Sequence, residues 1–133
     1  MTSTGETAPS GSYYEKRLGF VLPTRLPNSI PLYRLKLIEN GVVADYFFTR
    51  SQEEMSIAKS RGYGDDGIVG YVFADSSLAS LYGSPVQVFR FNNPTLKDHF
   101  YTTDTAEVNL LLTQTFRGYI QEVQYPFYII SSF

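Results

Sequence analysis

The sequence predicts an α+β domain, mainly an antiparallel sheet of short strands with helices packed on it. Short runs rich in Tyr, Phe, Val, Ile and Thr alternate with turn residues, which is typical of antiparallel strands. Helix-capping signals follow two of these runs, and the same order of runs occurs twice along the chain. Together these observations predict a fold built from imperfect β-β-α-β repeats.

The chain has the size of one domain. Its 133 residues are 43% hydrophobic and 16% aromatic, which provides enough apolar surface for a packed core. Residues 1–12 combine Thr, Ser, Gly and Pro with few apolar residues, and we expect a disordered tail there. Residues 13–133 then form a single globular domain of about two and a half repeats.

One unit recurs at an offset of 51 to 56 residues, which indicates a tandem copy. The recurring markers are LGFVLP (18–23) with VGYVFA (69–74), IPLYRL (30–35) with VQVFRF (86–91), and DYFFT (45–49) with DHFYT (98–102). A further run, VQYPFY (123–128), matches the first marker at an offset of 54. Three markers in the same order favour duplication over chance.

Each unit is predicted to run strand, strand, helix, strand. The runs 30–35 and 86–91 are followed by the turn signals ENG (39–41) and NNP (92–94), so each should form a hairpin with the DxFxT run after it.

A capping box after each DxFxT run predicts a helix. It pairs Ser51 with Glu54 in the first unit and Asp104 with Glu107 in the second, so that the cap oxygen accepts early amides and the acid reaches back. The residues expected to pack each helix on the sheet are Met55 and Ala58 in the first, and Val108, Leu111, Leu112 and Thr115 in the second.

The remaining segments complete the unit. The helices end at Gly62 and Gly118. The stretch GYGDDGIVG (62–70) lacks the GK[ST] ending of a phosphate loop, and we expect a loop with both aspartates exposed. The stretch SSLASLYG (76–83) predicts one helical turn, and YPFYII (125–130) predicts a strand with an apolar edge.

Composition excludes several classes of function. With no cysteine and one histidine, His99, the chain has no disulfide, no thiolate metal site and no pair of His ligands. A net charge of -2 and the absence of a basic run argue against nucleic acid, and no apolar stretch is long enough for membrane insertion. We expect no cofactor and no metal.

The polar N-terminus predicts a cytoplasmic protein, one released without a signal peptide, or a mature secreted form.

One face of the DxFxT strand is the expected ligand site. Alternate side chains of a strand share a face, so His99 and Tyr101 lie opposite Phe100, which we place in the core. Polar-tipped rings stack well on sugar rings, while a carboxylate such as Asp98 accepts hydroxyl hydrogens. The candidate ligand-binding residues are Tyr33, Arg34, Tyr63, Arg90, Asp98, His99 and Tyr101. Alternatively, Tyr101 and His99 pack beneath the helix of their own unit.

Two equivalent arginines, Arg34 and Arg90, are the preferred ligand contacts because a guanidinium binds a planar acid or a pair of hydroxyls. The alternative is a buried salt bridge within each unit. Its partners would be Asp45 or Glu54 for Arg34, and Asp98 or Glu107 for Arg90. Tyr63 follows the first helix and either lines the rim of a pocket or packs the helix on the sheet.

Catalysis is the less favoured hypothesis. Asp98 and His99 are neighbours in a strand and point to opposite faces, so they form no relay. A glycosidase needs two carboxylates across a cleft, and the fold would have to bring Asp98 together with Glu107 or Asp45. The two aspartates of the 62–70 stretch supply too few oxygens for calcium.

The segments DHFYTTD (98–104) and YGDDGIVGYVF (63–73), together with LYRL (32–35), resemble a repeat domain family of unassigned activity. Its members occur as modules beside secreted hydrolases in bacteria and as small fungal proteins. The first unit departs from the family pattern at Tyr46 and Arg50. More loosely, the chain is similar to small mushroom lectins, which implies glycan binding and dimers that pair edge to edge.

The leading hypothesis is therefore a non-catalytic, lectin-like protein that binds glycans or glycoproteins and pairs exposed strand edges in a homodimer. The second is a protein-interaction or structural module without a small-molecule site. The third is a glycoside hydrolase that uses Asp98 or Glu107.

Overall fold

A computed structural model of the chain describes residues 21–132. The predicted tail (1–12) and the first part of the 18–23 run lie outside the described residues. In chain order, the elements are β1 (Ile30–Glu39), β2 (Val42–Thr49), α1 (Gln52–Ser60), β3 (Gly64–Val72), α2 (Ser76–Ala79), β4 (Ser84–Asn93), β5 (Asp98–Thr102), α3 (Thr105–Thr113), a 3-10 turn (Thr115–Arg117) and β6 (Ile120–Ser132).

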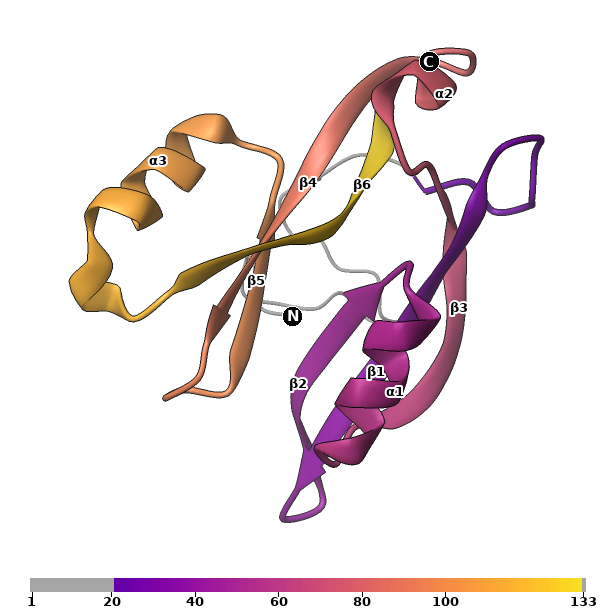
Figure 1. Cartoon of the computed structure of the whole chain (residues 1–133). Helices are drawn as coiled ribbons and strands as arrows, with labels where there is room; N and C mark the ends of the chain where they lie inside the picture. Colours follow the sequence, from indigo (N-terminus) through magenta and orange to yellow (C-terminus); the bar gives the residue numbers. More distant parts are fainter. Residues whose placement is uncertain (1–20, 133) are drawn as a thin grey trace.

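The strands form two small antiparallel sheets. The first has the order β2-β1-β3 and the second the order β5-β4-β6, and each has three strands. Figure 1 shows them at an angle to one another, with α1 against the first sheet and α3 beside the second. An isolated bridge between Phe73 and Tyr128 also connects the two halves. The predicted α+β class with short antiparallel strands is confirmed, although the strands form two sheets instead of one.

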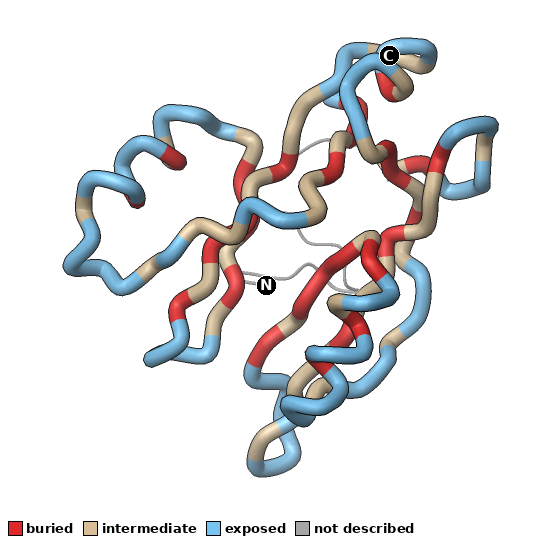
Figure 2. The backbone as a smooth tube through the Cα atoms, in the orientation of Figure 1, coloured by how far each residue is buried: buried red, intermediate tan, exposed pale blue. Residues whose placement is uncertain are grey.

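The main hydrophobic core lies between the two sheets, where buried residues concentrate along the strands (Figure 2). Its buried members are Leu32, Phe48 and Val72 from the first half and Val88, Tyr101, Phe127 and Ile129 from the second. The rings of Phe48 and Tyr101 meet edge to face with their centroids 5.4 Å apart, a favoured aromatic geometry. The face of Tyr101 that the sequence analysis expected to be open is therefore buried in this core.

Helix α1 begins as predicted. The N-cap Ser51 accepts the backbone N–H of Glu54 on its Oγ, and Met55 and Ala58 are buried against the first sheet. The predicted second contact of the capping box is wrong, because the carboxylate of Glu54 does not accept the backbone N–H of Ser51. The backbone N–H of Ser51 donates to Thr49 Oγ1 instead, which leaves Glu54 to bind other partners.

Helix α3 has the predicted N-cap, Asp104, which accepts the backbone N–H of Ala106. Val108 and Leu111 are buried, but Leu112 is 47% exposed, so its predicted packing on the sheet is wrong. A short helix on a narrow sheet buries only the strip that faces the strands, and Leu112 lies outside that strip. None of the helices in the described part of the chain is long and apolar enough to cross a membrane.

Strand β3 replaces the loop predicted at 62–70. Gly64 to Val72 pair with β1, and Gly67 has a positive φ of 93° that interrupts the regular pairing. Asp65 is exposed as expected, whereas Asp66 is only 19% exposed. The loop was predicted from the glycines, and pairing with a neighbouring strand overrides that local preference.

Strand β6 is an edge strand of the second sheet that buries only part of its apolar side chains, because Ile120 and Val123 are exposed. Phe127, Ile129 and Ile130 are buried within the chain itself. The apolar side chains at the end of this strand are thus covered within the chain, and the homodimer through exposed strand edges stays a prediction.

Matching hydrogen bonds occur in the two halves. The pairs are Thr49–Glu54 and Thr102–Glu107, Tyr63–Asp45 and Tyr119–Asp98, and Arg34–Asp66 and Arg90–Glu122. These pairs agree with the tandem-copy hypothesis, which stays a prediction.

Candidate functional site

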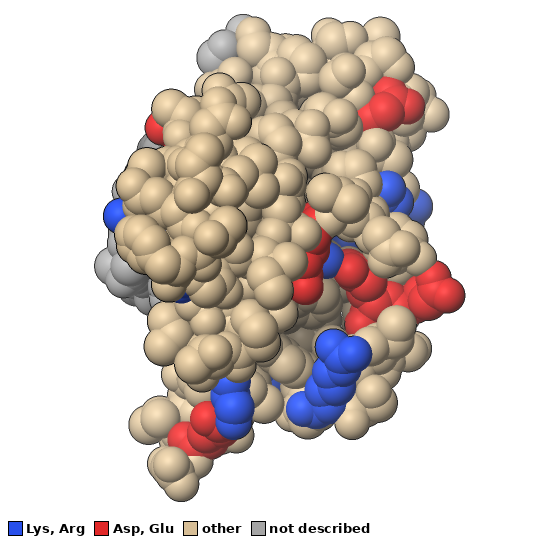
Figure 3. All heavy atoms as spheres, turned by 60° about the vertical axis from the view of Figure 1, so that its left-hand side comes forward, with Lys and Arg blue, Asp and Glu red and all other residues tan. Residues whose placement is uncertain are grey.

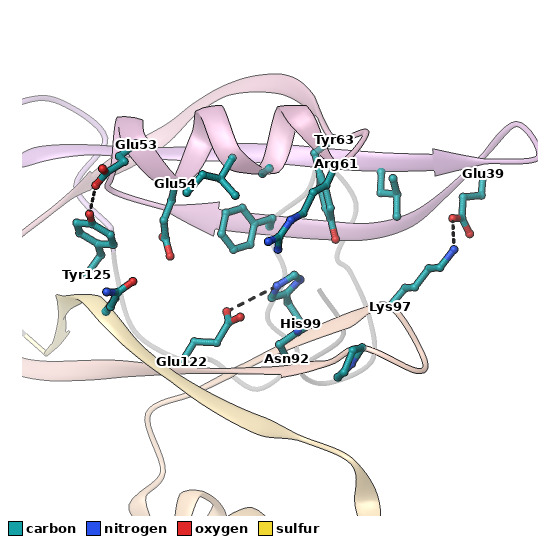
Figure 4. A pocket seen from close by; sticks show the side chains of 16 residues that line it. Glu39, Glu53, Glu54, Arg61, Tyr63, Asn92, Lys97, His99, Glu122 and Tyr125 are labelled. Carbon is teal, nitrogen blue, oxygen red and sulfur yellow. Dashed lines mark hydrogen bonds and ion pairs between the residues drawn. The ribbon is translucent and has the colours of Figure 1, made fainter.

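A cleft of about 610 Å³ opens between the two halves of the molecule. Helix α1 and strand β2 form one wall, and strands β4 to β6 form the other (Figure 4). Figure 3 shows acidic and basic side chains close together around a hollow in the surface, on a face that is otherwise mostly uncharged. The polar and aromatic residues that line the cleft are Glu39, Phe47, Glu53, Glu54, Arg61, Tyr63, Asn92, Lys97, His99, Glu122, Gln124 and Tyr125.

His99 lies on the floor of the cleft, on strand β5. Its Nδ1 is 2.6 Å from Oδ2 of Asp45, which belongs to β2 in the other half, and its ring lies 4.8 Å from the ring of Phe47. Its Nε2 faces Glu122 across 3.7 Å (Figure 4). The neighbouring Asp98 points away from His99, as expected for adjacent residues of a strand. The carboxylate that binds His99 belongs instead to Asp45 of the distant strand β2.

Asp45 holds this floor in place. Its side chain is fully buried and accepts three hydrogen bonds, from Nδ1 and the backbone N–H of His99 and from the hydroxyl of Tyr63. A buried carboxylate needs such donors to offset the loss of water. Burial, and then the hydrogen bond to Asp45, raise the pKa of Tyr63, so the phenol stays neutral and remains a donor.

Arg90 is not an open ligand contact. It is 7% exposed, and its guanidinium donates to both carboxylate oxygens of Glu54 and, through Nε, to Glu122 at 2.6 Å. It also lies over the ring of Phe47, 4.7 Å from the centroid. Burial acts to lower the pKa of Arg90, but the hydrogen bonds with Glu54 and the nearby charges of Glu122 and Glu54 together outweigh it, and the pKa lies above its ordinary value.

Both predicted roles of Arg90 are thus corrected. It is sealed by carboxylates instead of facing a ligand, and those carboxylates are not the Asp98 or Glu107 that we expected within its own unit. Arg90 reaches Glu54 of the first half, so this ion pair fastens the two halves together below the cleft.

Arg34 occupies the equivalent position in the first half and lies outside the cleft. Its Nε donates to Asp66 at 2.7 Å, and its guanidinium lies 5.1 Å from the ring centre of Tyr46. Burial acts to raise the pKa of Asp66, but Lys36 and Arg34 outweigh it, so the pKa is lowered. The predicted partners of Arg34, Asp45 and Glu54, bind other groups.

Tyr101 and Tyr33 do not line the cleft either. The hydroxyl of Tyr101 accepts the backbone N–H of Phe48 at 2.7 Å in the core, and burial raises its pKa. The hydroxyl of Tyr33 accepts a hydrogen bond from Gln52 on the outer surface. The prediction of Tyr101 as a ligand contact is wrong because its side chain is buried between the two sheets and only 2% exposed.

Asp98 is the counterpart of Asp45 and lies outside the cleft. It accepts the hydroxyl of Tyr119 at 2.8 Å, and burial followed by that hydrogen bond raises the pKa of Tyr119 to about 12. Of the seven residues predicted from the sequence, Tyr63 and His99 line the cleft.

Sequence reasoning missed most of the residues around these two. Glu122 gave a usable signal, because it is a lone charged residue in the otherwise uncharged run of β6. No sequence signal marked Arg61 or Tyr125. They line the cleft only because α1 and β6, which lie far apart in the chain, face one another across it.

The arrangement suits recognition of a polar ligand. Glu122 and Nε2 of His99 offer acceptors, Asn92 offers a donor, and Tyr125 adds an aromatic ring at the rim, where its hydroxyl donates to Glu53. Within residues 21–132, no three His, Asp or Glu side chains are placed to hold a metal ion.

A family model described as Domain of unknown function (DUF5648) matches residues 31–131 of the chain. The match spans both sheets and the cleft between them, and it agrees with the resemblance to a domain family of unassigned activity. No curated protein and no solved structure matches the chain.

Proposed function

The chain belongs to this domain family of unknown function, and we propose that it is a non-catalytic carbohydrate-binding protein that holds a glycan in the cleft between its sheets. The cleft itself carries the proposal. Its volume of about 610 Å³ falls in the range of roughly 300–1,000 Å³ that is typical of small-ligand sites.

The chemistry of the lining favours a sugar over an apolar ligand. Sugar hydroxyls both donate and accept hydrogen bonds, and the cleft offers carboxylate, imidazole and amide groups in Glu122, His99 and Asn92. The rings of Tyr63 and Tyr125 provide flat surfaces for the apolar face of a pyranose. Nucleic-acid phosphates are disfavoured by the glutamates that line the same walls.

Binding without catalysis is favoured by the hydrogen bonds of Glu54 and Glu122, the two carboxylates of the cleft that lie next to Arg90. Both oxygens of Glu54 are bound by Arg90, and one oxygen of Glu122 is bound by the same guanidinium. A glycosidase requires one carboxyl group placed to give a proton to the leaving group, whereas both of these carboxylates are engaged as hydrogen-bond acceptors of one guanidinium. Asp98 and Glu107, the catalytic residues considered in the sequence, do not line the cleft.

A glycan array followed by calorimetric titration of the best hit tests the proposal, with two equivalent tyrosines as matched variants. Tyr63 lines the cleft and Tyr119 does not, yet each donates one hydrogen bond to an aspartate. Tyr63→Ala should weaken binding by at least about tenfold, and Tyr119→Ala should leave it within about twofold.

Thermal unfolding of both variants controls for loss of fold. Silence on a broad array, or equal binding by the two variants, would contradict a glycan site in the cleft and favour the interaction-module hypothesis. The proposed homodimer is tested separately by sedimentation equilibrium, where a monomer at high concentration would refute it.

A further inference from the structure

Two hydrogen-bond acceptors face one another on the floor of the cleft. The Nδ1–H of His99 donates to Asp45, so in the neutral imidazole the lone pair is on Nε2. Nε2 lies 3.7 Å from Oε1 of Glu122, which is too long for a direct hydrogen bond. His99 is 8% exposed, and this end of its ring points into the cleft. A donor placed between the two atoms would satisfy Nε2 and use the remaining lone pair of Oε1.

Glu122 also carries charge that its neighbours do not fully balance. Its Oε1 accepts Nε of Arg90, but the same guanidinium binds both oxygens of Glu54. One positive charge is therefore shared by two carboxylates. The side chain of Glu122 is 30% exposed, and its second oxygen has no hydrogen-bond partner among residues 21–132.

The whole cleft has an excess of negative groups. Among the described residues, the carboxylates in and directly behind it are Glu39, Asp45, Glu53, Glu54 and Glu122. The cations at the same site are Arg61, Arg90 and Lys97, and Arg50 lies over the ring of Tyr125 at the rim. Lys97 is bound to Glu39, so it does not offset the charge on the floor.

The exposed side chain of Arg61 extends from the end of α1 toward His99 (Figure 4). It has no ion pair with a described residue, and it reaches into the part of the cleft where the two acceptors lie. The place between Glu122 and His99 thus suits a positive group, and a ligand cation would compete with Arg61 for it.

We infer that the ligand of the cleft is an amine-bearing saccharide, whose protonated amino group binds between Glu122 and His99. This inference rests on the proposed function. An ammonium group carries three N–H donors and a full charge, so it bonds to the carboxylate and to Nε2 together. A neutral hydroxyl has one hydrogen and leaves the charge unbalanced.

The test compares two oligosaccharides of equal length and linkage, one of glucosamine and one of N-acetylglucosamine, by calorimetric titration of the full chain at about pH 6.5, where a large share of the sugar amines is charged. We expect the glucosamine oligomer to bind at least about tenfold more tightly. Glu122→Gln should reduce that preference to about threefold or less, and Glu107→Gln, which changes the same residue type outside the cleft, should keep it.

A second measurement keeps the test valid if Glu122→Gln disturbs the fold. Arg61→Gln removes the competing cation from an exposed position and should strengthen binding of the glucosamine oligomer, while added salt should weaken it in the wild type.

The outcomes separate the two proposals. If the acetylated oligomer binds equally well or better, or if Arg61→Gln weakens the amine ligand, the amine inference is wrong and the glycan site stands. If neither oligomer nor any arrayed glycan binds, the glycan site is refuted and the inference falls with it.

Discussion

Oδ2 of Asp45 lies 2.6 Å from Nδ1 of His99, although the two residues are 54 positions apart in the chain. Asp45 belongs to the first sheet and His99 to the second, so the contact connects the two halves. It orients the imidazole with Nε2 toward the cleft, and it depends on the packing of both sheets. Several consequences of this packing can be measured.

Asp45→Asn should lower the free energy of unfolding by about 2–4 kcal/mol, because an amide cannot accept all three buried hydrogen bonds that the carboxylate accepts. Urea unfolding followed by fluorescence measures the change. Asp65→Asn, at an exposed site, should cost less than about 1 kcal/mol. A cost for Asp45→Asn as small as that of Asp65→Asn would contradict the buried network.

Arg90→Ala should be more damaging than the loss of a surface ion pair. It leaves the largely buried Glu54 and the partly exposed Glu122 without their shared partner, which we expect to cost about 3–5 kcal/mol. Glu39→Gln breaks the exposed pair with Lys97 and should cost less than about 1 kcal/mol. Equal costs, measured by chemical denaturation of both variants, would show that the Arg90 pair does not fasten the halves together.

Tyr101→Phe should destabilise the core despite the small change in volume. The substitution removes the acceptor of the Phe48 backbone N–H and leaves that donor buried, at a cost of about 1–3 kcal/mol. Tyr128→Phe removes only a long contact with Gln87 at 3.4 Å, and it should be nearly neutral. A neutral Tyr101→Phe in the same thermal unfolding series would mean that the hydroxyl does not cap Phe48.

Stability should fall as the pH rises above about 10, the pKa of a free tyrosine. The pKa values of Tyr63, Tyr101 and Tyr119 are raised in the folded chain, that of Tyr119 to about 12, so above pH 10 the folded state binds more protons than the unfolded state. Absorbance titration of the phenols should show these groups neutral at pH 11 in the native protein. Ordinary titration of all 11 tyrosines near pH 10 would contradict the buried hydrogen bonds.

Local sequence signals predicted the elements well. The apolar and aromatic runs IPLYRL (30–35) and VQVFRF (86–91), with the turn signals after them, identified β1 and β4, and the caps at Ser51 and Asp104 identified the starts of both main helices. These features depend on neighbours two to four positions away, so they can be read without the fold. The glycines of the 62–70 stretch misled the prediction, because β1 recruits that segment as a strand.

The contacts of the candidate site could not be predicted in the same way. The sequence by itself determined that the chain carries one imidazole, paired arginines and acids in matching places, and enough aromatic residues for a core. Only the tertiary structure decided that Arg90 pairs with Glu54 and Glu122, that His99 is hydrogen-bonded to Asp45, and that Glu122 faces the cleft. The physical reason is that a charge pairs with whatever group the packing of two sheets brings within a few ångströms, and that distance is not encoded in local spacing.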